Sequence, residues 1–174
     1  PNPGVTLGLT NQNTSGFALQ QLATGGSQSW YSVGGVQHPV QWTSQNGSVS
    51  ITTGGTTYDL GSMSQLPDSG ISYMIVTAPG GGSVPVGTSH CSDSPGNQQN
   101  CLAAGATVQV FLPGQTQPAY SFVSIAEGHD PQPSVSPFGV QVTEGNSGFT
   151  NLGRTYFENL NYLYDPVNGF VGYQ

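Results

Sequence analysis

Short apolar or alternating runs, separated by glycine- and asparagine-rich breaks, cover most of the chain. Their length and spacing predict strands joined by tight turns rather than helices. Gly-Gly pairs and Asn46-Gly47 suit the positive backbone angles of hairpin turns. The expected strands cover residues 17–19, 36–42, 49–51, 58–60, 72–78, 107–112 and 119–125. Residues 128–137 are rich in proline and are expected to form a surface loop.

One segment near the C-terminus has helical spacing instead. Tyr156, Phe157 and Leu160 lie on one face at i, i+1 and i+4, which predicts a short helix over 154–160 with Tyr156, Phe157 or Leu160 facing the core. A strand, a tight turn over 165–169 and a closing strand are expected after it. The predicted fold class is therefore all-β with a short helix near the C-terminus.

The composition agrees with a folded domain. The chain has 174 residues, enough for one compact core. It is rich in glycine and proline, yet two Trp, eight Tyr and seven Phe are spread along it, which disfavours disorder. No internal repeat is present.

Charge excludes two classes of partner. The chain has no lysine, Arg154 is its one arginine, and its formal net charge is -7. Nucleic acid binding needs clustered basic residues, as does binding to an anionic membrane surface, so neither partner is expected. No apolar run is long enough to span a bilayer.

Cys91 and Cys101 flank a segment with the composition of a loop, and a disulfide between them is favoured over two free thiols. Such a bond would stabilise the fold by roughly 3 kcal/mol through loop closure. It indicates an oxidising compartment, so the protein is expected to be secreted, either extracellular or periplasmic, as a mature chain whose leader has been removed. Two cysteines without a histidine at ligand spacing make a poor zinc site, and no metal is expected.

Asp68-Ser69-Gly70, entering the apolar run that starts with Ile71-Ser72, is the candidate motif for chemistry. A carboxylate followed by a small hydroxyl residue and a glycine can be presented at a loop tip, where the glycine lets backbone N–H groups approach it. Taken alone, the tripeptide is more often an ordinary turn.

The C-terminal pattern gives this motif more weight. Asn151-Leu152-Gly153, the short helix and residues 163–172 together resemble the end of the C-terminal lobe of a pepsin-like aspartic peptidase. The resemblance implies that Asp68 is the catalytic aspartate, that Ser69, Gly70 and Ser72 support its loop, and that Leu152-Gly153 crosses beneath that loop. It also implies a disulfide in the region of Cys91 and Cys101.

Within this resemblance, residues 1–174 form a single lobe. Residues 58–174 carry the matching elements, and residues 1–57 would supply its remaining N-terminal strands without a motif match. Three positions depart from the family pattern. Leu66-Pro67 replaces two apolar strand residues, and Arg154 replaces an aspartate. Ile71 replaces a hydroxyl that would stabilise the ionised carboxylate, so its presence is expected to raise the pKa of Asp68.

The family's chemistry requires two aspartates, one from each lobe, that share a proton and activate water against a peptide or protein substrate, without a cofactor. This chain has one such motif. The second aspartate is expected from another chain, from a removed N-terminal segment or from a symmetric copy.

Two other functions remain open at this stage. One is a non-catalytic pepsin-like domain acting in adhesion, in inhibition or as part of a larger surface protein. The other is a β-sandwich that binds sugars through Trp30, Tyr31 and Trp42. The scattered residues His38, His90 and His129 are expected to be structural.

Overall fold

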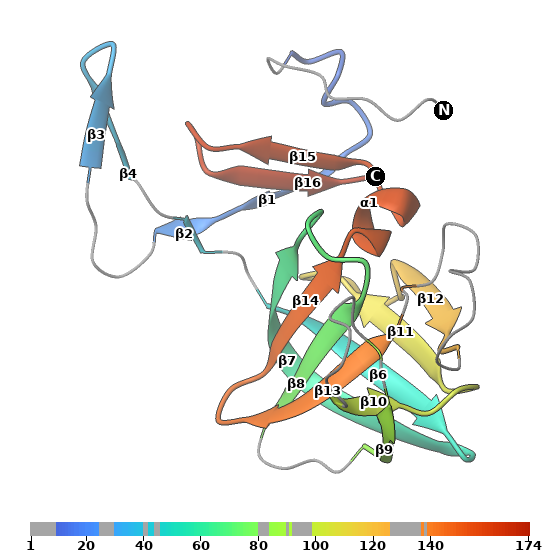
Figure 1. Ribbon diagram of the computed structural model, residues 1–174. Helices are drawn as coiled ribbons and strands as arrows, with labels where there is room; N and C mark the ends of the chain where they lie inside the picture. Colours follow the sequence, from blue (N-terminus) through green and yellow to red (C-terminus); the bar gives the residue numbers. More distant parts are fainter. Residues whose placement is uncertain are drawn as a thin grey trace. The chain divides into compact units, whose positions relative to one another are not determined.

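The computed structural model describes residues 10–24, 30–39, 42–43, 46–79, 84–89, 91, 99–125, 137 and 139–174. The chain divides into two compact units (Figure 1). One contains Pro1–Ser44 and Leu160–Gln174, and the other contains Gln45–Asn159.

The larger unit is built on a nine-stranded sheet with the strand order β12-β11-β6-β7-β14-β8-β13-β10-β9. Its strands are β6 (Gly47–Thr53), β7 (Thr56–Pro67), β8 (Met74–Pro79), β9 (Val86–Ser89), β10 (Gln99–Leu102), β11 (Thr107–Phe111), β12 (Tyr120–Val123), β13 (Val140–Gly145) and β14 (Phe149–Gly153). The helix α1 (Thr155–Asn159) follows β14 directly. The all-β fold with a short helix near the C-terminus is thus confirmed.

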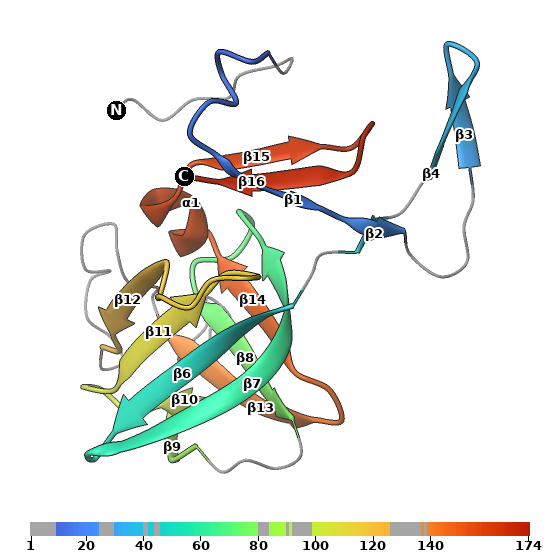
Figure 2. The same cartoon turned by 180° about the vertical axis from the view of Figure 1, so that it is seen from behind.

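Two parallel pairings distinguish this sheet from a series of hairpins. β14 lies between β7 and β8, parallel to β7 and antiparallel to β8, while β8 is also parallel to β13. Figures 1 and 2, which view the unit from opposite sides, show the sheet strongly curved, with β6 and β7 lying across β8 and β13. The inner face of this curved sheet holds the core.

The core is filled by apolar side chains at alternate positions along the strands. In β8, Met74, Val76 and Ala78 are almost fully buried and alternate with half-exposed residues. Val49 and Ile51 of β6 are also two residues apart and fully buried, although Ser50 between them is buried as well. This period of two, which puts successive side chains on opposite faces, is the pattern from which these strands were predicted.

The crossing of β14 beside the β7–β8 connection leaves no room for a side chain at Gly153. Its φ of +61° is in the left-handed region, and a Cβ there would lie 2.4 Å from the carbonyl oxygen of Tyr73 and 3.2 Å from that of Ile71. Only glycine fits both the backbone angle and the close approach. The Arg154 N–H then donates to the Ile71 carbonyl oxygen at 2.9 Å.

The smaller unit contains a three-stranded antiparallel sheet with the order β1-β16-β15, made of β1 (Ala18–Gln21), β15 (Tyr162–Asp165) and β16 (Phe170–Tyr173). Two further strand pairs belong to it: β2 (Ala23–Thr24) with β5 (Trp42–Thr43), and β3 (Trp30–Val33) with β4 (Val36–Pro39). The predicted strand, turn and strand at the C-terminus are confirmed by β15 and β16.

The predicted helix is confirmed in a shorter form. Tyr156 is fully buried, which confirms the prediction that Tyr156, Phe157 or Leu160 faces the core, whereas Phe157 is 39% exposed. A helix of one turn has too narrow an apolar stripe to bury two successive side chains on the same side. Most of the loop predicted over 128–137 lies outside the described residues.

The structure contains the predicted disulfide between Cys91 and Cys101, which ties Cys91 to β10. Both cysteines are buried. Cys91 packs against the backbone of Gly139, because a Cβ added at Gly139 would lie 2.6 Å from the Cβ of Cys91. The disulfide therefore fixes the chain beside β10 and the start of β13.

Replacing Gly153 by alanine should destabilise the larger unit strongly. The left-handed φ costs about 1–2 kcal/mol for a residue with a Cβ, and the contact with the Tyr73 carbonyl requires the backbone to move as well. We expect the free energy of unfolding, measured by urea denaturation with circular dichroism, to fall by more than about 2 kcal/mol.

Gly61 provides a matched control, because its φ is +66° and nothing lies within 4 Å of an added Cβ. Gly61→Ala should cost only the strain of the backbone angle, about 1–2 kcal/mol. Equal losses in the two variants would contradict the close crossing at Gly153.

The disulfide should be detectable by mass and by stability. Alkylation should modify the two cysteines only after reduction, as measured by intact mass. Replacing both with alanine should lower the free energy of unfolding by roughly 3 kcal/mol, because the unfolded chain gains the freedom of the opened loop. Alkylation of both thiols in the unreduced protein would contradict the assignment.

Candidate functional site

The candidate site is the connection that follows β7. β7 ends at Pro67, and the six residues from Asp68 to Tyr73 lead into β8. Asp68 is half-buried, while Ser69 and Gly70 are exposed, so the carboxylate lies at the surface end of the strand. Ser72 is half-buried as the chain enters β8.

Both oxygens of the Asp68 carboxylate accept hydrogen bonds from N–H groups. The Gly70 backbone N–H donates to Oδ1 at 2.8 Å, and the Asn151 side-chain amide Nδ2 donates to Oδ2 at 2.8 Å. A Cβ at position 70 would lie 3.1 Å from Oδ1, so glycine permits the close approach of this turn. The carboxylate is therefore held from two directions.

Asn151 is itself fixed by the crossing strand. It is 7% exposed, and its Oδ1 accepts the backbone N–H of Gly153 at 3.0 Å. Leu152 between them is 1% exposed and belongs to the core. The structure thus brings Asp68, Gly70, Leu152 and Gly153 together around one backbone crossing.

These contacts set the pKa of Asp68 below its ordinary value. The hydrogen bond from Asn151 is the largest cause and the one from Gly70 the next, and both outweigh the raising effect of burial. The predicted effect of Ile71 compares this loop with one that carries a hydroxyl at the same position, so the lowered pKa does not bear on it and it stays a prediction. The donor that the sequence did not indicate is the Asn151 amide.

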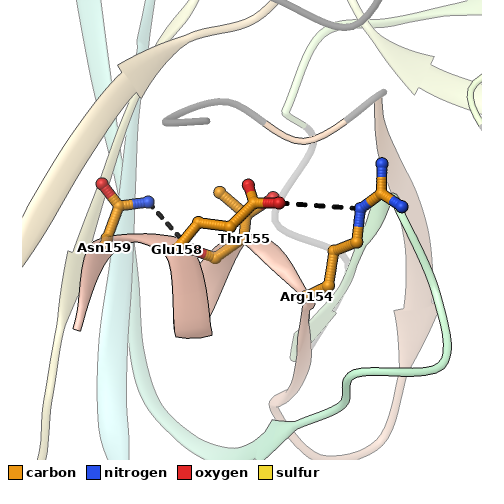
Figure 3. Close-up of polar contacts among 4 residues, drawn as sticks. All are labelled: Arg154, Thr155, Glu158 and Asn159. Carbon is orange, nitrogen blue, oxygen red and sulfur yellow. Dashed lines mark hydrogen bonds and ion pairs between the residues drawn. The ribbon is translucent and has the colours of Figure 1, made fainter. Parts of the chain in front are cut away.

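Arg154 follows the crossing strand, and its side chain pairs with a residue of α1. Its Nε lies 3.8 Å from Oε1 of Glu158, an i, i+4 pair on the solvent side (Figure 3). Asn159 Nδ2 donates to the Thr155 carbonyl at 2.8 Å in the same turn. A pair this exposed contributes little to stability. In this arrangement the guanidinium pairs with its own helix.

Two further aspartates serve turns. Asp59 accepts the Gly61 N–H at 3.0 Å. Asp165 accepts the N–H groups of Val167 and Asn168 and the Asn168 side-chain amide. Burial acts to raise the pKa of Asp165, but these hydrogen bonds outweigh it and lower the pKa. Asp93 and Asp130 lie outside the described residues.

Asn151 was not identified from the sequence as a site residue. The sequence held no signal for it, because the burial of positions 150–153 in a strand at the centre of the sheet is known only from the structure. A buried amide must find hydrogen-bond partners, and an aspartate at the end of the neighbouring strand is one of the few groups able to provide them.

The alternative sites receive little support. Among the described residues, no three His, Cys, Asp or Glu side chains are close enough to hold a metal ion, and no helix is long and apolar enough to cross a membrane. Trp42 donates its Nε1 to the Pro166 carbonyl at 2.8 Å and packs on Gly169, so its ring has a structural role. The side chains of Trp30, Tyr31 and His38, and the whole of His90 and His129, lie outside the described part.

Comparison of the chain with models of protein families, with curated proteins and with solved structures found no match.

The lowered pKa of Asp68 predicts a pH dependence of stability. Its contribution to the free energy of unfolding is fully present above the ordinary aspartate pKa and is lost as the pH falls through the lowered folded-state value. Asp68→Asn should therefore be less stable than wild type near neutral pH, with a gap that closes in acid. Urea denaturation from about pH 6 to about pH 2 measures this gap, and a gap independent of pH would contradict the assignment.

Proposed function

We propose that this chain is a pepsin-like lobe that contributes Asp68 to the active site of an aspartic endopeptidase, with the second aspartate supplied by another lobe. The substrate is an extended peptide or protein segment, and no cofactor takes part. The oxidising environment indicated by the disulfide supports an extracellular or periplasmic location.

The observation that carries the proposal is the support of Asp68 by a backbone crossing. The carboxylate accepts N–H groups from its own loop and from β14, and Gly153 of β14 passes against that loop without room for a side chain. By contrast, the turn aspartates Asp59 and Asp165 accept hydrogen bonds from residues two or three positions further along their own turns.

In the proposed reaction the ionised carboxylate acts as a base toward a water molecule. The water oxygen attacks the peptide carbonyl carbon while its proton moves to the carboxylate, and the protonated aspartate of the other lobe donates its proton to the carbonyl oxygen. As the carbon–nitrogen bond of the resulting tetrahedral diol breaks, Asp68 gives the proton that it took from water to the leaving amine nitrogen, and a hydroxyl of the diol returns a proton to the other aspartate. Gly70 and Asn151 hold the base in place through these steps.

A second candidate is a non-catalytic pepsin-like domain that acts in adhesion, in inhibition or within a larger surface protein. The observation that favours it is the single Asp-Ser-Gly of the sequence, combined with Ile71 and Arg154 at positions that depart from the family pattern. The same fold would then serve only to present surfaces.

Cleavage of a peptide library at acidic pH tests the proposal. The isolated chain should be a poor peptidase, because one carboxylate cannot act as base and acid in the same step. Addition of a separately produced N-terminal lobe of a pepsin-type enzyme should give cleavage that a pepsin-type transition-state inhibitor blocks. Asp68→Asn should abolish this activity while retaining the circular dichroism spectrum of the wild type.

Cleavage that persists in Asp68→Asn would exclude Asp68 as the catalytic residue. If neither the chain alone nor any pairing with a second lobe gives cleavage, the non-catalytic domain becomes the better account.

A further inference from the structure

We infer that Asn151 is a positioning residue that holds Asp68 as the ionised, water-activating member of the carboxylate pair, and that the proton-bearing member comes from a lobe unlike this one. This inference rests on the proposed function of the site. It assigns a role to each carboxylate of the pair and a chemical property to the missing partner.

The first support is the direction of the hydrogen bonds. Oδ1 and Oδ2 of Asp68 each accept an N–H at 2.8 Å, one from Gly70 and one from Asn151. A carboxylate accepts at both oxygens, whereas a protonated carboxyl carries a donor on one of them. A proton on either oxygen would weaken the hydrogen bond that this oxygen accepts.

The second support is that the Asn151 amide cannot reverse. An amide has a donor end and an acceptor end, and it can exchange them by rotating. Here the acceptor end is occupied by the Gly153 N–H at 3.0 Å, and the side chain is 7% exposed. Rotation would set two donors against each other at Gly153 and two acceptors against each other at Asp68. A hydroxyl at this place could donate or accept, but this amide can only donate to Asp68.

Charged neighbours do not account for the state of Asp68. Tyr73 lies in the same connection, and Arg154 and Glu158 follow the crossing strand, where they pair with each other. The causes of the lowered pKa of Asp68 are the two hydrogen bonds, opposed by burial, and none of these three side chains is among them. The hydrogen bond that Asn151 donates, together with the one from Gly70, therefore favours the ionised form of the carboxylate.

The nature of the partner follows from this preference. A second copy of the chain would bring the same Asn151 and the same preference for the ionised form. Two such carboxylates would repel each other and would share a proton only in stronger acid. An aspartate without an amide that can only donate to it can hold the proton more readily. A lobe with such an aspartate therefore fits the site better than a symmetric copy of this chain.

Carbon-13 NMR of the aspartate carboxyl groups in the full chain tests the role of Asn151 without any need for activity. Asp68→Asn identifies the Asp68 signal by its loss. In the wild type, Asp68 should titrate below the ordinary aspartate range, and Asn151→Leu should move the titration to higher pH. Thr150→Val is the control, because the Thr150 hydroxyl is buried beside Met63 Sδ rather than at the site, so this variant should leave the titration unchanged.

An ordinary titration of Asp68 in the wild type would overturn the inference even if Asn151→Leu fails to fold. An unchanged titration in a folded Asn151→Leu would do the same. The claim that the partner is an unlike lobe would fail if the chain alone cleaved peptides, with a rate that depends on Asp68 and rises with the square of the chain concentration. If the titration behaves as expected while no second lobe restores cleavage, the proposed function fails and the role of Asn151 in fixing the charge of Asp68 stands.

Discussion

The crossing of β14 between β7 and β8 is the constraint on which the site depends. It places Gly153 against the carbonyl oxygens of Ile71 and Tyr73, and this contact tolerates no Cβ. Because β14 is parallel to β7, the ends of both strands arrive at the same edge of the sheet, where Asp68 and Asn151 meet. The fold thus brings together residues 83 positions apart in sequence to hold one carboxylate.

The chain builds this site almost without charge. Arg154 is the one arginine and there is no lysine, and the causes of the Asp68 pKa are N–H donors rather than cations. Fixed dipoles of this kind favour the ionised form of a carboxylate without a cationic partner. A protein with few ionised groups also has few ion pairs to lose as its carboxylates become protonated.

Sequence reasoning succeeded where the signal was local and failed where it depended on distant partners. Alternation predicted β8 and β11, and the spacing of Tyr156 predicted a helix. By contrast, β9 was not predicted, because a short strand with mixed composition is defined by the strand beside it.

The candidate site shows the same division. Asp68 and Gly153 could be chosen from their motifs, but the donor to the carboxylate could not. The sequence indicated a loss at Ile71, whereas the structure supplies the hydrogen bond from Asn151, whose role depends on a pairing across the sheet. Exposure of Phe157 was likewise decided by packing around a single helical turn.

The most direct test of this account is the pH response of two N–H signals in the proton–nitrogen NMR spectrum, the Gly70 backbone amide and the Asn151 side-chain amide. Both should lie downfield in the range expected for hydrogen bonds to a carboxylate, and both should move upfield together at one low pH as Asp68 takes up a proton. Two signals that move independently, or that do not respond to acid at all, would show that these groups do not hold the carboxylate of Asp68.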